Sequence, residues 1–136
     1  MGYLFIAGYI VIVGLASFLM KVSLKSLTPY QLNFLMGIGM LLTGLPALLI
    51  AQRSFKFPVK ELPLGLLIGV MMASGSLLYV LAFNKLDASV AAVLATLYVA
   101  VIVILSGIFL KEGFDLIKVL GLLLAFIGTA LLTLKS

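Results

Sequence analysis

Few residues of this sequence can do chemistry, and their types narrow that chemistry sharply. The chain contains no Cys and no His, and its only acids are Glu61, Asp87, Glu112 and Asp115. Disulfides, thiol or imidazole catalysis and metal sites built from Cys or His are therefore excluded. We predict that the protein is not an enzyme and has no catalytic residue, metal ion or cofactor.

Most other polar side chains lie inside long apolar runs, where a polar group is costly unless it meets a polar partner or water. Ser and Thr can bond to the backbone of their own helix, whereas Asn33, Tyr79 and Tyr98 are harder to satisfy in this way. Lys21 either reaches the membrane interface as an anchor or points into a wet cavity, where it could bind a carboxylate or phosphate. Polar positions on four separate runs predict a substrate cavity between helices. The candidate residues for this cavity are Ser17, Lys21, Asn33, Ser74, Tyr79, Thr96 and Tyr98.

The elements that position these residues are apolar helices. Hydrophobic residues make up 65% of the chain and charged residues 10%, against about 45–50% and 25% in soluble domains. At about 1.5 Å per residue, a helix over 88–110 would cross a hydrocarbon core of roughly 30 Å. Thr28, followed by Pro29, and Asp87 are suited to begin helices, and Gly113 suits the end of one. The sequence predicts an all-α integral membrane protein of one domain, residues 1–136, that crosses the cell membrane several times. Its five predicted transmembrane helices cover about 3–25, 29–51, 63–84, 87–110 and 115–134.

The positive charges lie at or near the ends of the apolar runs, where cations meet lipid headgroups or orient loops. This placement excludes a nucleic-acid site despite the net charge of +5. Five helices put the two termini on opposite sides of the membrane. The N-terminal side then carries Arg53, Lys56, Lys60, Lys111 and Lys118, and the other side carries Lys21, Lys25, Lys85 and Lys135. A difference of one cation is a weak orientation signal, so two readings stay open: insertion both ways, or a cytoplasmic N-terminal side in every copy.

Small residues recur every four positions in three of the predicted helices. Such a stripe lets helix backbones approach closely in lipid, where no hydrophobic force drives helices together. We therefore predict that the stripes are packing surfaces. The predicted packing residues are Gly65, Gly69, Ala73, Ala92, Gly121 and Ala125.

Two stretches resemble a known family. The segment "ASFLMKVSLKSLTPYQLNFLMG" is similar to the first helix pair of the EamA-type repeat in the drug/metabolite transporter superfamily, and "VLAFNKLDASVAAVLATLYVAVIVILSGIFLKEGFDLIKVLGLLLAFIGTALL" is similar to its last three helices. The resemblance implies half of a ten-helix transporter, in which two such repeats have inverted orientations. Many members carry a proline at the position of Val99, so a straighter fourth helix is expected here.

The resemblance implies a transporter of small metabolites or drugs. Because all four acids lie at the ends of the predicted helices, a facilitator or exchanger is favoured over coupling to protons through a deep carboxylate, with export as the expected direction. A single repeat needs a second half, which an antiparallel homodimer of dual topology or a paired half-transporter would supply. Two other functions stay open: a lipid-carrier flippase or its subunit, and a membrane interaction protein that transports nothing. The expected partners are a small-molecule substrate, the lipid bilayer and the second half.

Overall fold

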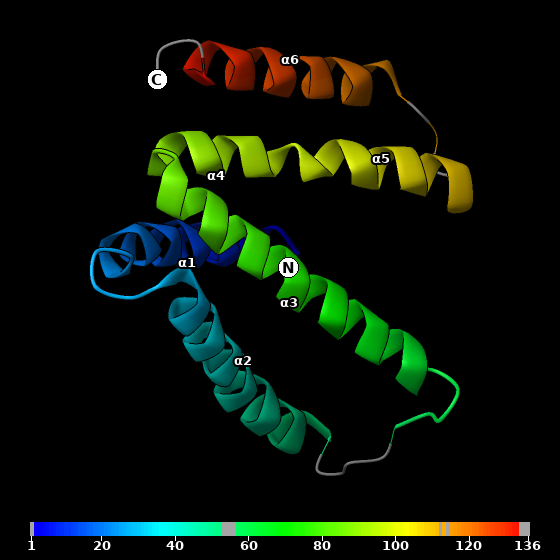
Figure 1. Ribbon diagram of the computed structural model, residues 1–136. Helices are drawn as coiled ribbons and strands as arrows, with labels where there is room; N and C mark the ends of the chain where they lie inside the picture. Colours follow the sequence, from blue (N-terminus) through cyan, green and yellow to red (C-terminus); the bar gives the residue numbers. More distant parts are fainter. Residues whose placement is uncertain (1, 53–56, 112, 114, 134–136) are drawn as a thin grey trace. The chain divides into compact units, whose positions relative to one another are not determined.

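The described chain is entirely helical. The computed structural model describes residues 2–52, 57–111, 113 and 115–133, and no strand occurs among them. Arg53, Lys56, Glu112 and Lys135 lie outside the described residues. The helices are α1 (Gly2–Ser23), α2 (Pro29–Gln52), α3 (Leu62–Lys85), α4 (Ala88–Thr96), α5 (Tyr98–Phe109) and α6 (Leu116–Thr133) (Figure 1).

Four helical segments are long and apolar enough to cross a membrane, with α4 and α5 counted together as Ala88–Phe109. The apolar helix α6 is shorter. These elements confirm the predicted all-α membrane fold. The chain divides into two compact units, Met1–Asn84 with α1 to α3 and Lys85–Ser136 with α4 to α6, so the single domain stays a prediction.

Helix α2 begins where the sequence predicts, because a capping box satisfies its first turn. The Gln31 backbone N–H donates to Thr28 Oγ1 at 3.3 Å, and the Thr28 N–H donates to Gln31 Oε1 at 3.0 Å. Pro29 occupies the first helical position, whose N–H needs no partner. Helix α1 ends at Ser23 rather than reaching residue 25, and a turn over 24–26 follows it.

The fourth predicted helix, 87–110, is not one continuous α-helix in the structure. It is interrupted at Leu97, whose N–H bonds to Leu94 O at 3.1 Å, three residues back instead of four. The hydroxyl of Thr96 donates to Val93 O at 2.6 Å, and such back-bonding competes with regular helix geometry. Helix α4 therefore gives way to α5 without a proline.

Two predicted helix signals act differently in the structure. Asp87 is the N-cap residue of α4, yet its side chain makes no capping hydrogen bond. After α5 the left-handed residue is Lys111, with φ 54°, and no described glycine has a positive φ. Asp87 therefore stands at the predicted N-cap position, with extended backbone but without the side-chain hydrogen bond of a cap, and the left-handed residue that follows α5 is Lys111.

The unit Met1–Asn84 is held together at one end of its helices. Its buried apolar side chains are Met20 of α1, Leu32 of α2, and Val80 and Phe83 of α3. From this end α2 and α3 diverge (Figure 1). Other large apolar side chains of these helices are mostly exposed on the single chain, as expected for faces that meet lipid or another protein chain.

Candidate functional site

Polar side chains from three apolar helices meet at the packed end of α1, α2 and α3. Ser17 Oγ of α1 lies 3.5 Å from Tyr79 Oη of α3. Ser76 Oγ, also on α3, donates to Asn33 Oδ1 of α2 at 2.6 Å. All four side chains are half-buried, so these polar groups satisfy one another inside helices that are otherwise apolar.

Lys21 makes a second link between α1 and α3. Its Nζ donates to the backbone oxygen of Phe83 at 2.7 Å, and Lys21 is half-buried. The Phe83 ring packs against Tyr79, with ring centroids 4.6 Å apart and planes tilted by 53°. We call Ser17, Lys21, Asn33, Ser76 and Tyr79 the α1–α3 polar cluster.

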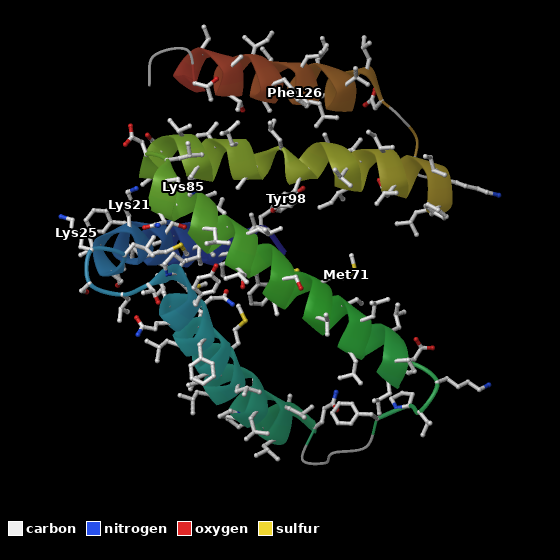
Figure 2. All side chains as sticks on the ribbon, viewed as in Figure 1. Lys21, Lys25, Met71, Lys85, Tyr98 and Phe126 are labelled. Atoms are coloured by element: carbon white, nitrogen blue, oxygen red, sulfur yellow. The ribbon has the colours of Figure 1, made fainter. Side chains whose placement is uncertain are left out.

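The spacing along each helix explains why these groups converge. Residues three or four apart in a helix lie on the same face, which places Ser17 with Lys21 on α1. The same rule places Ser76, Tyr79 and Phe83 together on α3. Figure 2 shows Lys21 and Lys25 at the end of α1 that turns toward α2.

Four of the seven predicted cavity residues belong to this cluster: Ser17, Lys21, Asn33 and Tyr79. Ser74 does not, because it is exposed and its hydroxyl donates to Val70 O of its own helix at 2.8 Å. Thr96 and Tyr98 lie in the other unit, Lys85–Ser136. Tyr98 is 57% exposed at the start of α5.

Ser76 was not among the predicted cavity residues, although the structure pairs it with Asn33. A usable signal was present in the sequence, since Ser76 shares a helix face with Tyr79 at a spacing of three. No sequence signal indicated that Phe83 would accept a hydrogen bond from Lys21, because the acceptor is a backbone oxygen, which every residue has.

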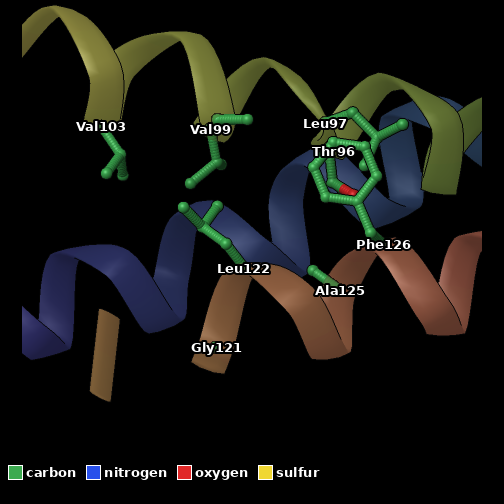
Figure 3. Close-up of a pocket in the computed structure, with 9 residues that line it drawn as sticks. Thr96, Leu97, Val99, Val103, Gly121, Leu122, Ala125 and Phe126 are labelled. Carbon is green, nitrogen blue, oxygen red and sulfur yellow. The ribbon is translucent and has the colours of Figure 1, made fainter. Parts of the chain in front are cut away.

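The unit Lys85–Ser136 contains an apolar cavity of about 290 Å³ between α6 and the α4–α5 junction (Figure 3). Among the side chains that the structure describes, Thr96 is the only polar one that lines it, and the Thr96 hydroxyl is already bonded to Val93 O. The described lining therefore offers room but no spare hydrogen-bond donor. Three small residues, Ala100, Gly121 and Ala125, contribute to its walls.

In the described part of the chain, the glycines of the small-residue stripes have no close neighbour outside their own helix. Helices α4 and α6 are in contact, and Thr129 of α6 is buried, with its hydroxyl donating to Ala125 O at 2.7 Å. A Cβ added at Gly65, Gly69 or Gly121 would meet no group within 4 Å. Close helix packing at these glycines stays a prediction that a second chain would have to fulfil.

Each of the described acids lies just before the start of a helix. Glu61 precedes α3, Asp87 precedes α4 and Asp115 precedes α6, and all three are exposed. Within residues 2–52, 57–111, 113 and 115–133, no three acidic side chains gather into a possible metal site. The cluster can offer hydroxyl, carboxamide and ammonium groups to a ligand, but no carboxylate.

We expect Ser76→Ala to lower the free energy of unfolding by about 1 kcal/mol, because it leaves Asn33 without its half-buried partner. Ser74→Ala is the matched control on the same helix, since the Ser74 hydroxyl is exposed and bonds only to its own helix. Its effect should stay within about 0.5 kcal/mol. Unfolding in mixed micelles of increasing denaturing detergent measures both. Equal losses would contradict a stabilising Asn33–Ser76 link.

Comparison with protein-family models gives a match to the EamA-like transporter family over residues 1–134. Neither the curated proteins nor the solved structures that were searched gave a match. The family match spans all six helices and both compact units.

Proposed function

The chain belongs to the EamA-like transporter family, and on this premise we propose that it moves small metabolites or drugs across the cell membrane as an antiparallel pair of identical chains. The family lies within the drug/metabolite transporter superfamily, whose members are membrane transporters of small molecules rather than enzymes. The multi-pass helices agree with this assignment. The proposal adds the antiparallel pair, the use of the polar cluster and export as the direction.

The α1–α3 polar cluster is the observation that carries the proposal. Three helices with almost entirely apolar surfaces bring hydroxyl, carboxamide and ammonium groups to one place. Polar groups at membrane depth are costly and commonly mark a substrate path. In the proposed transporter, Ser17, Asn33, Ser76 and Tyr79 exchange their mutual hydrogen bonds for bonds to the substrate.

The absence of an acid from this cluster supports a facilitator or an exchanger. A carboxylate buried between helices would titrate as protons enter and leave, which is how proton relays work in membrane proteins. The described acids are instead exposed and precede helices. Substrate binding to hydroxyl and carboxamide groups requires no such titration.

Three features of the chain support pairing with a second copy. One repeat supplies only half of an inverted-repeat pathway, and a chain inserted in the opposite orientation supplies the rest. The nearly balanced Lys and Arg residues on the two sides suit a chain that inserts both ways. The large exposed apolar surface of α2 and α3 leaves room for this partner.

Topology is tested with single cysteines introduced at Ser26 and at Val59, because the chain has no Cys of its own. Both positions are exposed, in the segments before and after α2, so they lie on opposite sides of a membrane that α2 crosses. With a membrane-impermeant thiol reagent on intact cells, we expect each site to react in roughly half of the molecules. Complete reaction at one site and none at the other would exclude the antiparallel pair.

A further inference from the structure

Lys21 sits at the C-terminal end of a helix other than its own. Its Nζ donates to Phe83 O at 2.7 Å, and Phe83 lies in the last turn of α3, which ends at Lys85. The last four carbonyl groups of a helix have no donor within that helix. The ammonium of α1 therefore supplies a donor that the end of α3 needs.

Charge and burial both favour this contact. The C-terminal end of a helix carries partial negative charge, so a cation there is stabilising, and more so where it is partly shielded from water. The Phe83 side chain is fully buried and Lys21 is half-buried. A shielded ammonium needs hydrogen bonds, and the carbonyl oxygen of Phe83 provides one.

The same contact fixes the neighbouring turn. Ser17 precedes Lys21 by one turn of α1, and Tyr79 precedes Phe83 by one turn of α3. The structure pairs Ser17 with Tyr79 and Lys21 with Phe83, so two successive turns of the helices are linked in register. The Tyr79 ring also packs on the Phe83 ring at 4.6 Å, which transmits the position of Phe83 to Tyr79.

We propose that Lys21 is a positioning residue that caps the C-terminal end of α3 and thereby holds the Tyr79 hydroxyl against Ser17. This role differs from both sequence-based expectations for Lys21, an interfacial anchor and a ligand for substrate anions. Its importance for transport rests on the proposed function, whereas its effect on Tyr79 does not. Lys21 acts on the site through Phe83.

Fluorine NMR of the protein labelled with 3-fluorotyrosine tests this role without any substrate. The chain has five tyrosines, and each resonance is assigned by replacing one tyrosine with Phe. Lys21→Met removes the ammonium but keeps most of the aliphatic chain. We expect the Tyr79 resonance to shift by more than its linewidth, while those of Tyr3, Tyr9 and Tyr98 stay in place.

Two control variants distinguish the positioning of Tyr79 from a general effect of lost positive charge and from a general loss of packing. Lys25→Met removes an exposed cation one turn further along the chain and should leave Tyr79 unchanged. Lys21→Arg keeps a cationic donor and should restore most of the native Tyr79 signal. If Lys21→Met does not fold, Lys21→Gln takes its place. An unmoved Tyr79 resonance, or the same movement in Lys25→Met, would overturn the proposal.

The outcome is independent of whether the chain transports anything. A Tyr79 shift in a chain that proves unable to move any compound would refute the proposed function and leave the positioning role intact. An unmoved Tyr79 resonance in a chain that does transport a compound would refute the positioning role and leave the proposed function intact.

Discussion

Two variants of this chain with opposite charge bias should each be inactive alone and active when they are produced together. The first carries Lys60→Gln, Lys111→Gln and Ser26→Lys, which moves positive charge to the side of the α1–α2 turn. The second carries Lys25→Gln and Lys85→Gln, which leaves the excess on the opposite side. The orientation of membrane helices follows the side richer in Lys and Arg, so each variant should insert in one orientation only.

The loss of activity follows from the antiparallel pair. A population with one orientation cannot form the inverted arrangement that completes the pathway, so transport should fall to the level of cells that lack the chain. Producing both variants restores both orientations and, with them, transport. The substituted side chains are exposed on the single chain, so folding itself should change little.

The measurement is accumulation, in cells, of a compound that the native chain moves, with labelling of a cysteine at Val59 as the record of orientation. Cells with two gene copies of one variant serve as the control, because they match the expression level of cells that produce both variants. If either variant alone inserts in one orientation and keeps native transport, the pair cannot be antiparallel.

The sequence was a good guide to the membrane helices because their length and, for α2, the cap are local properties. The third helix was predicted at 63–84 and occupies Leu62–Lys85, and the start of α2 follows from Thr28 and Pro29. The interruption at Leu97 was not predictable from hydropathy. It depends on competition for hydrogen bonds beside Thr96 within a run of uniformly apolar residues.

The candidate site was predictable in part for the same reason. Asn33 and Tyr79 stand out because a carboxamide and a phenol are rare and costly inside apolar helices. Their partners depend on how far each helix is rotated and shifted against the next, which tertiary packing sets. The acceptor for Lys21 is a backbone oxygen, and no pattern of side chains indicates which carbonyl group a lysine will reach.

Gly69→Leu should separate two chains without unfolding either one. On α3, residues 65, 69, 73, 76, 80 and 83 follow helical spacing and share one face. Ser76, Val80 and Phe83 on this face are packed within the unit, whereas a Cβ at Gly65 or Gly69 would meet nothing within 4 Å. Because the single chain has room at Gly69, and because Gly weakens a helix by about 1 kcal/mol relative to Ala, we expect no loss of stability within one chain.

The expected effect lies between chains. If a second copy packs closely against the Gly65–Gly69 part of α3, a leucine there pushes the two backbones apart and removes the contacts that hold helices together in lipid. Energy transfer between donor-labelled and acceptor-labelled chains in liposomes should then fall toward the value for randomly mixed, unpaired chains. Gly75→Leu is the control, since Gly75 is on the same helix, is equally open within the chain and lies off this face. Equal energy transfer in the two variants would show that the two chains do not meet at this face of α3. A loss of energy transfer in Gly69→Leu alone would show that the face of α3 that packs within one chain also packs against the partner.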